Sequence, residues 1–240
     1  MMASADGGNT TRVKICGVQR VEDAIEAARS GADFIGIAFV PGRRRTLEPS
    51  EARRIVSSLR DAAHRPPKVV GLTAGQPLAD VRHIVVESGV DMVQLCGGED
   101  LEYAEGVGVP VIKVVHVPLS EDRGETLDRI RREVQAFRDR GHTVTLDRKV
   151  GELQGGTGES FDWELAKALS DEGYSFFLAG GLTPENVGEA VRSVRPWGVD
   201  VSTGVETGGY KDAGKIRAFV AAARAAQEDF GGDGAPSLER

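Results

Sequence analysis

The chain has 240 residues, of which 40% are hydrophobic and 28% charged, and its formal net charge is −7. This length allows one domain with a sizeable core, and the composition is ordinary for a soluble globular protein. The acidic balance argues against a nucleic-acid-binding protein, which usually carries a basic face. No apolar stretch approaches the ~20 residues that span a bilayer. From the charge and the missing apolar stretch together, we expect neither nucleic acid nor a membrane as partner.

Two cysteines are too few for a disulfide framework, so we expect a reducing, cytoplasmic compartment. The N-terminal residues lack the basic and hydrophobic regions of a secretory signal. Both ends are rich in Gly, Ser and Asp, which predicts disordered tails over 1–11 and 229–240. Residues 12–228 are expected to form a single domain.

Short apolar runs alternate with segments of helical periodicity along the whole chain. The expected strands are, in chain order, 13–16, 34–39, 69–72, 92–95, 111–115, 143–146, 176–179 and 199–201. The expected helices are 21–30, 49–62, 78–88, 101–105, 126–140, 161–172, 184–193 and 212–228. Strands that are apolar throughout and alternate with helices indicate a parallel sheet covered by helices. Eight such units favour an α/β fold of the closed (β/α)8 TIM-barrel type, with outer helices, over an open doubly wound sheet.

Two helix boundaries carry local signals. Thr183 followed by Pro184 predicts a capping residue and the first residue of the seventh helix. Ser30 followed by Gly31 predicts the end of the first helix, because glycine accepts the left-handed conformation found there.

A cysteine stands at the end of the first predicted strand. Side chains alternate along a strand, so Lys14 shares the face of Cys16 one layer deeper. A cationic neighbour would lower the pKa of the thiol and increase the thiolate fraction. An arbitrary cysteine is usually a small buried hydrophobe. At a strand end next to Gly17, where barrel enzymes build their active sites, a functional thiol is the better interpretation.

An aspartate stands at the end of the sixth predicted strand. Asp147 shares its face with Thr145. An aspartate after a strand is usually a helix cap or a turn residue. The next helix is not expected before residue 161, so capping does not account for this one and a general acid is favoured. A general acid must keep its proton longer than a free carboxylate does, and desolvation at a barrel mouth can supply that.

Two glycine-rich turns follow the seventh and eighth predicted strands. The first contains Gly180 and Gly181, and the second contains Ser202, Thr203 and Gly204. Such turns expose backbone N–H groups that suit a phosphate dianion, and barrel enzymes often bind phosphate after strands seven and eight. The glycines could merely turn the chain, but two such turns after consecutive strands favour a phosphate site.

Three adjacent arginines, Arg43, Arg44 and Arg45, follow the second predicted strand. Such a run is usually a solvated charge cluster, yet one arginine that reaches over the barrel mouth could bind a substrate carboxylate. A loop over 148–160 contains three glycines, a composition suited to a lid. The four histidines show no metal-ligand spacing and no dinucleotide or Walker motif is present, so no metal is expected.

Together these motifs resemble the N-(5′-phosphoribosyl)anthranilate isomerase family of tryptophan biosynthesis, from about residue 13 to residue 223. In the first half the similar segments are Val13-Lys14-Ile15-Cys16-Gly17, Asp33-Phe34-Ile35-Gly36 and Val93-Gln94-Leu95. In the second half they are Gly155-Gly156-Thr157-Gly158, Phe161-Asp162-Trp163, Ala179-Gly180-Gly181-Leu182-Thr183-Pro184-Glu185-Asn186-Val187, Val199-Asp200-Val201-Ser202-Thr203-Gly204-Val205-Glu206 and Lys211-Asp212. The combination, in this order, is highly specific.

The resemblance implies a cofactor-free Amadori rearrangement, an aldose–ketose isomerisation of N-(5′-phosphoribosyl)anthranilate to 1-(o-carboxyphenylamino)-1-deoxyribulose 5-phosphate. It implies that Asp147 is the general acid and Cys16 the general base. It places Arg45 at the anthranilate carboxylate and Asp200 opposite the ring or amine. The substrate phosphate would rest on backbone amides of the two glycine turns, from Gly180, Gly181, Ser202, Thr203 and Gly204.

The sequence departs from the family pattern at a few positions near the expected site. Cys96 stands where the family usually has a histidine, and Thr203 replaces a serine. The run Arg43-Arg44-Arg45 replaces a usual Ser-Pro-Arg or Ser-Lys-Arg, so it stays open which arginine meets the carboxylate. These departures affect the expected affinity and substrate range, including related aminoaldose phosphates, more than the reaction type.

Three alternative functions remain. Another phosphate-binding barrel enzyme, such as the histidine-pathway isomerase of a related aminoaldose or a thiamine phosphate synthase, would share the glycine turns. The former would be expected to end its first strand in an aspartate instead of Cys16. A non-catalytic barrel subunit would be expected to have lost Cys16 or Asp147, and a covalent thiol enzyme would need a base, for which His116 is the candidate near a strand end. The oligomeric state stays open between a monomer and a homodimer.

Overall fold

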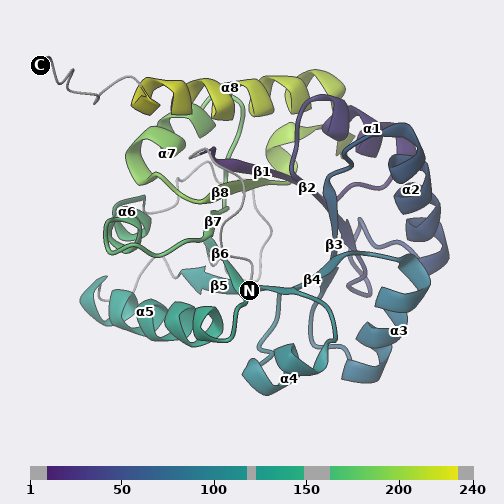
Figure 1. The fold of residues 1–240 in the computed structure, drawn as a ribbon, viewed down its shortest axis with the longest axis horizontal. Coiled ribbons are helices and arrows are strands. Elements are labelled where there is room, and N and C mark those ends of the chain that lie inside the picture. Colours follow the sequence, from purple (N-terminus) through teal and green to yellow (C-terminus); the bar gives the residue numbers. More distant parts are fainter. Residues whose placement is uncertain (1–9, 118–122, 149–162, 232–240) are drawn as a thin grey trace, which may run out of the picture.

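A computed structural model describes residues 10–117, 123–148 and 163–231 of the chain. Its eight main strands pair in parallel and in chain order, and the eighth pairs with the first to close a barrel. Helices surround the barrel on all sides (Figure 1). The predicted (β/α)8 architecture is therefore confirmed. Within the described ranges, no helix has the length and apolar character needed to cross a membrane.

The barrel strands are short and lie close to the expected positions. They are β1 Arg12–Cys16, β2 Phe34–Ala38, β3 Lys68–Thr73, β4 Met92–Leu95, β5 Val111–Val117, β6 Thr143–Arg148, β7 Phe177–Leu178 and β8 Gly198–Val201. The helices are α1 Val21–Arg29, α2 Pro49–Ala62, α3 Leu78–Ser88, α4 Leu101–Gly106, α5 Arg123–Asp139, α6 Trp163–Asp171, α7 Val187–Val194 and α8 Ala213–Gly231.

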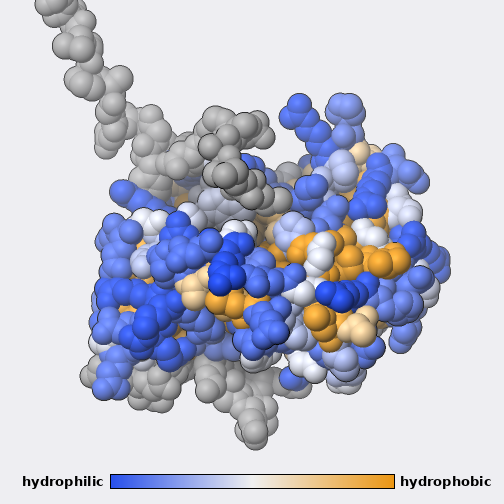
Figure 2. Space-filling view, turned by 60° about the horizontal axis from the view of Figure 1, so that its bottom comes forward, coloured by the Kyte–Doolittle hydropathy of each residue, from blue (hydrophilic) through white to orange (hydrophobic). Residues whose placement is uncertain are grey.

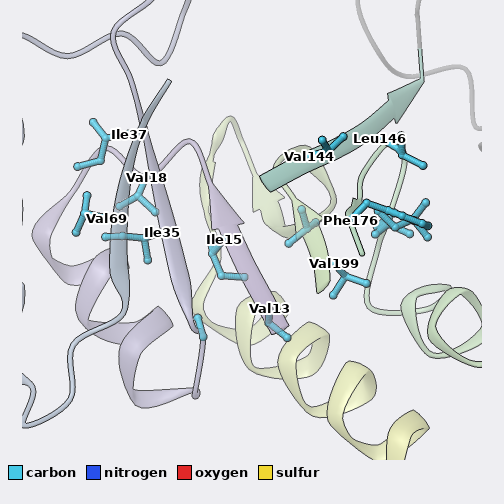
Figure 3. Packing of buried hydrophobic residues seen from close by; sticks show 14 of the residues in the cluster. Val13, Ile15, Val18, Ile35, Ile37, Val69, Val144, Leu146, Phe176 and Val199 are labelled. Carbon is cyan, nitrogen blue, oxygen red and sulfur yellow. The ribbon is translucent and has the colours of Figure 1, made fainter. Parts of the chain in front are cut away.

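Alternation along the strands separates two apolar layers. On β1, Val13 and Ile15 point outward to the helices, where they join the large cluster shown in part in Figure 3. A smaller cluster fills the lower barrel interior with Val70, Met92, Ile112 and Phe177. The outer cluster packs the helices against the strands. The inner cluster fills only the part of the barrel interior near the N-terminal ends of the strands, here called the lower interior. The upper interior, near the C-terminal ends, is therefore left for polar side chains.

The N-terminal end of the barrel is closed by aromatic rings. Trp197 lies edge-on to Phe177 with ring centroids 4.9 Å apart, and Phe34 meets Phe177 edge-on at 5.3 Å. Edge-to-face contacts of this kind add to the free energy gained from burial. This end carries packing, and the polar residues gather at the opposite end.

The seventh helix begins later than predicted. The structure places Pro184 in a turn, and α7 starts at Val187. The side chain of Asn186 accepts a hydrogen bond from the backbone N–H of Thr183 at 2.8 Å, and the Thr183 hydroxyl accepts one from Glu185 N–H at 3.3 Å. These side chains satisfy the backbone of a separate turn, so Thr183 does not cap the helix. The predicted end of α1 is confirmed, with Ser30 at the cap and Gly31 at φ 88°.

A short hairpin after β8 was not predicted. The 3-10 helix η1 (Thr203–Val205) leads into β9 (Glu206–Thr207), which pairs antiparallel with β10 (Tyr210–Lys211). Two-residue strands are too short to show hydrophobic alternation. The signal that could have found the hairpin is the Gly208-Gly209 pair, because both residues adopt positive φ and such pairs form tight hairpin turns.

The described structure extends beyond the expected domain of residues 12–228 at both ends. Thr11 is buried, and its backbone N–H donates to the side-chain oxygen of Gln227 on α8 at 2.8 Å. Helix α8 continues to Gly231, past the expected domain end at residue 228. In the face shown in Figure 2, the left side over α5 is mostly hydrophilic, and apolar residues gather on the right, over α3 and α4. Val86 on α3 is 68% exposed.

Candidate active site

The thiol of Cys16 points into the barrel at the end of β1. The side chain is 7% exposed. A Cβ added at Gly36 on β2 would approach the Cys16 Sγ to 2.9 Å, so the glycine provides the space that the sulfur occupies. Gly17, the next residue, adopts φ 76° and turns the chain outward. The local sequence therefore holds the thiol at the C-terminal mouth.

A buried ion pair lies beneath the thiol. Lys14 Nζ donates to Asp200 Oδ2 on β8 at 2.7 Å, and the two side chains are 0% and 6% exposed. The pairing follows from the register that sets Lys14 beside Asp200 across the β1–β8 seam. The second oxygen of Asp200, Oδ1, is buried and has no hydrogen-bond partner among the described residues. It is therefore free to accept a hydrogen bond from a ligand.

The expected lowering of the thiol pKa by Lys14 is not the net result. Burial raises the pKa of Cys16 and outweighs the opposing effect of the Lys14 ammonium, while the Asp200 carboxylate raises it further. Burial lowers the pKa of Lys14, but the charges of Asp200 and Cys16 together raise it, so the lysine stays protonated. Lys14 thus lowers the pKa of the thiol as expected, but burial raises it by more, and the net shift is upward.

Asp147 lies near the end of β6, one residue before its last residue, Arg148. Burial raises the pKa of Asp147 to about 6, and the nearby Asp200 charge raises it too, against lowering by His116. A Cβ at Gly180 would come within 3.0 Å of Asp147 Oδ1, so the turn after β7 lies against this carboxyl. The expected desolvation at the barrel mouth is present.

The two glycine turns are in contact with each other. Gly180 and Gly181 adopt φ of 91° and 76°, which favour glycine over residues with a Cβ. A Cβ at Gly204, in η1, would collide with the carbonyl oxygen of Leu182 in the first turn. The turn that contains Gly180 and Gly181 therefore lies against the turn that contains Ser202, Thr203 and Gly204.

Of the three arginines, Arg45 is the one that reaches the mouth. Its side chain is 23% exposed, against 52% for Arg44, and Arg43 is exposed. A Cβ at Gly17 would meet the Arg45 Cδ at 2.6 Å and the Ser202 Oγ at 3.2 Å. Arg45 thus lies across the turn that follows Cys16, whereas Arg44 extends toward Gly209 in the hairpin.

Glu206 and Lys211, for which the sequence predicts no role, lie beside Arg45. Glu206 accepts hydrogen bonds from Arg45 and from Lys211, and the Lys211 side chain is 1% exposed. Burial raises the pKa of Glu206, but hydrogen bonds from Arg45, Lys211 and Arg44 together lower it to about 2. Glu206 and Lys211 both lie in segments that resemble the family. This resemblance is the signal that could have identified them as site residues.

Cys96, which stands at the family's usual histidine position, follows β4 at the mouth. Burial raises the pKa of Cys96 to about 12, and the charge of Cys16 acts in the same direction. Its sulfur lies 3.6 Å from Nε2 of Gln94. Cys96 and His116 both line a cavity of about 840 Å³ between β4, β5 and α5. This second thiol is therefore protonated at neutral pH.

Two further expectations concern a lid and a metal site. The expected lid over 148–160 lies outside the described residues except for Arg148, the last residue of β6. Among the side chains in the described ranges, no group of three or more His, Cys, Asp or Glu is arranged to hold a metal ion.

Comparison with known proteins agrees with this geometry. The family model described as N-(5′phosphoribosyl)anthranilate (PRA) isomerase matches residues 13–222. The chain is 39% identical to the N-(5′-phosphoribosyl)anthranilate isomerase of Dehalococcoides mccartyi, over 87% of this chain and 94% of that protein.

Solved structures agree in both fold and sequence. The phosphoribosyl anthranilate isomerase of Thermotoga maritima superposes with a TM-score of 0.76 at 35% identity, over 90% of this chain and all of that chain. A phosphoribosyl anthranilate isomerase in complex with reduced 1-(o-carboxyphenylamino)-1-deoxyribulose 5-phosphate gives a TM-score of 0.73 at 32% identity, over 90% and 100% of the two chains. Because the family model spans residues 13–222 and the relatives match over nearly their whole length, this chain belongs to the N-(5′-phosphoribosyl)anthranilate isomerase family.

Proposed function

We propose that this chain isomerises N-(5′-phosphoribosyl)anthranilate with Asp147 as general acid and Cys16 as general base. The observation that carries the assignment is a carboxyl whose pKa is raised to about 6 by burial, at the same barrel end as a buried thiol. A carboxyl with this pKa keeps a useful protonated fraction near neutral pH. Two groups with separated pKa values are typical of an acid–base pair.

In the first step, the Asp147 carboxyl donates its proton to the furanose ring oxygen. The bond between C1′ and that oxygen breaks, and the nitrogen lone pair forms a C1′=N bond, giving a protonated Schiff base. The unpartnered Oδ1 of Asp200 is suited to accept a hydrogen bond from the substrate amine or a ring hydroxyl. The positive charge that develops on nitrogen would be stabilised beside this carboxylate.

In the second step, the Cys16 thiolate removes the proton at C2′. The electron pair of the C–H bond forms C1′=C2′, and the C1′=N electrons return to nitrogen, giving an enolamine. The enolamine tautomerises to the ketone when C1′ gains a proton and the C2′ hydroxyl loses one. Because burial raises the pKa of Cys16, the thiolate is the minor form at neutral pH, and a thiolate stripped of water is a strong base once formed. Thiol and carboxylate then exchange one proton through solvent and return to their starting states.

Substrate binding would use both anionic ends of the molecule. The phosphate would accept hydrogen bonds from backbone N–H groups of the two contacting glycine turns. The anthranilate carboxylate would meet Arg45, whose guanidinium lies across the Cys16–Gly17 turn. These two anchors would hold the ribose between Cys16 and Asp147.

We further infer a cytoplasmic enzyme that acts as a monomer or a homodimer. Both cysteines are free, which fits a reducing compartment. The family's substrate is a small phosphorylated metabolite, and the acidic chain suits neither nucleic acid nor an anionic membrane surface.

The test is the decay of fluorescence of freshly generated phosphoribosylanthranilate. We expect fast decay with the wild type, and a loss of ~10²-fold or more in turnover for Asp147→Asn and for Cys16→Ser, the usual scale for removing an acid or a base. Both variants should still bind reduced 1-(o-carboxyphenylamino)-1-deoxyribulose 5-phosphate. Cys96→Ser is the matched thiol control, with a far smaller loss expected.

Three results would count against this assignment. Near-normal turnover in either variant would remove that residue from its role. Equal losses for Cys96→Ser and Cys16→Ser would leave the base unassigned. If the wild type does not accelerate the decay, a related aminoaldose phosphate becomes the substrate to assay.

A further inference from the structure

A carboxylate that the proposed mechanism does not use lies at the centre of a cationic cluster. Glu206, the first residue of β9, has a side chain that is 8% exposed. Its Oε1 accepts from Arg45 Nε at 2.7 Å and from Lys211 Nζ at 2.9 Å. Its Oε2 accepts from Arg45 Nη2 at 2.9 Å and from Arg44 Nη2 at 2.7 Å. One carboxylate therefore binds three cations.

The Arg45 contact is the two-pronged one. Glu206 binds the Nε and Nη2 side of the guanidinium with two parallel hydrogen bonds, an arrangement that fixes the plane of an arginine. No described residue accepts a hydrogen bond from Nη1. Arg45 lies across Gly17, directly after Cys16, so the uncommitted edge of the guanidinium is held at the barrel mouth.

The charge balance of the cluster favours an anion. Three cations share one carboxylate, so a net positive charge remains at this edge of the mouth. Lys211 also donates to the backbone carbonyl of Ser202 at 2.9 Å. The same carboxylate is thus connected to Arg45 on one side and to the second glycine turn on the other.

We propose that Glu206 is a positioning residue that orients Arg45 toward the carboxylate of the substrate. The proposal rests on the proposed function, in which Arg45 binds the anthranilate carboxylate. An unrestrained arginine samples many rotamers and loses that freedom on binding. Glu206 removes most of this cost before the substrate arrives. The β9–β10 hairpin is then the element that sets recognition of the aromatic end of the substrate.

The experiment compares two ligands that differ only in the carboxylate. One is reduced 1-(o-carboxyphenylamino)-1-deoxyribulose 5-phosphate, and the other is its phenylamino counterpart without the carboxylate. Dissociation constants are measured for the wild type, Glu206→Gln, Arg45→Met and the double variant. Glu172→Gln is the matched control, because Glu172 also binds one arginine, Arg131, in two-pronged fashion, on the outer surface between α5 and α6.

We expect Glu206→Gln to weaken binding of the carboxylated ligand about 10-fold, since an ordered arginine–carboxylate pair is worth on the order of one power of ten. Binding of the carboxylate-free ligand should change less than about 2-fold on the same scale. In the Arg45→Met background, Glu206→Gln should have no further effect. Turnover at saturating substrate should fall much less than kcat/KM.

Other outcomes distinguish a failure of the positioning role of Glu206 from a failure of the carboxylate-binding role of Arg45. If Glu206→Gln weakens both ligands equally, or still acts in the Arg45→Met background, Glu206 works through the glycine turn and the proposal is wrong. If Arg45→Met itself does not discriminate between the ligands, the arginine assignment in the proposed function fails instead. Should Glu206→Gln not fold, Glu206→Asp replaces it; the shorter carboxylate cannot keep both Arg45 bonds, and the same selective loss is expected.

Discussion

Asp147, the proposed general acid, lowers the stability of the fold when it is ionised. Its pKa is raised to about 6 because burial and the Asp200 charge disfavour the ionised form. The folded protein therefore holds this proton more tightly than the unfolded chain does. The wild type has the full stability allowed by this group below about pH 3.8, the unperturbed pKa, and loses stability as the pH rises through the folded pKa.

Replacing this carboxyl is therefore expected to stabilise the protein while it removes activity. At pH 8, Asp147→Asn should raise the free energy of unfolding by up to about 3 kcal/mol, and near pH 4 by much less. Denaturant unfolding at both pH values measures the difference. The control is Asp61→Asn on α2, an exposed aspartate, with little expected change at either pH. Equal effects of Asp147→Asn at both pH values would show that burial does not disfavour the ionised form of Asp147.

At the scale of elements, the site depends on loops that touch each other. The 3-10 helix η1 approaches the turn after β7 so closely that only a glycine fits at residue 204. The hairpin that follows η1 holds Arg45 through Glu206. The segment from β8 to β10 therefore contains both the second glycine turn, proposed to bind the phosphate, and Glu206, which holds the arginine proposed to bind the carboxylate.

A methyl group at residue 204 should separate the two glycine turns. We expect Gly204→Ala to raise the KM for the phosphorylated substrate about 10-fold or more, and to cost on the order of 1–3 kcal/mol of stability, as overpacking usually does. Steady-state kinetics and inhibition by inorganic phosphate are the measurements. In the control Gly98→Ala, the added Cβ meets no atom within 4 Å, and small effects are expected. An unchanged KM in Gly204→Ala would move the phosphate elsewhere.

At the scale of the whole molecule, the barrel separates packing from chemistry along its axis. The lower interior is filled by apolar side chains and closed by the ring of Trp197 against Phe177. The upper interior holds Lys14, Asp200 and the thiol of Cys16. Parallel strands make this possible, because all their C-terminal ends face the same side.

This separation predicts a variant that loses stability and keeps its activity. Trp197→Ala removes two aromatic contacts from a side chain that is 40% exposed, so we expect a loss of about 2 kcal/mol and a fall in Tm of roughly 5 °C. The kcat/KM at 25 °C should stay unchanged. Val86→Ala, at a position that is 68% exposed, should change neither quantity. A reduced kcat/KM for Trp197→Ala without a fall in Tm would contradict the axial separation.

The strand–helix units and the turns between them depend on local patterns, so the sequence alone is enough to predict them. Apolar runs alternating with helical periodicity specify eight strand–helix units, and glycines mark the turns between them. The expected strands place Cys16, Asp147 and the glycine turns at their C-terminal ends. Parallel strands in a barrel present these ends to one side. Their convergence on one mouth therefore follows from chain order. The family resemblance supplied the reaction and the roles.

The tertiary structure decided what depends on contacts between distant segments. The Lys14–Asp200 pair joins residues 186 positions apart. The pKa of the Cys16 thiol is raised because burial outweighs the lowering by Lys14, and Asp200 raises it further. The choice of Arg45 among three identical neighbours, and its link to Glu206 161 positions away, likewise depend on how two loops meet. Periodicity reports which face of an element is buried, whereas pKa values and ion pairs depend on which side chains the closed barrel brings together.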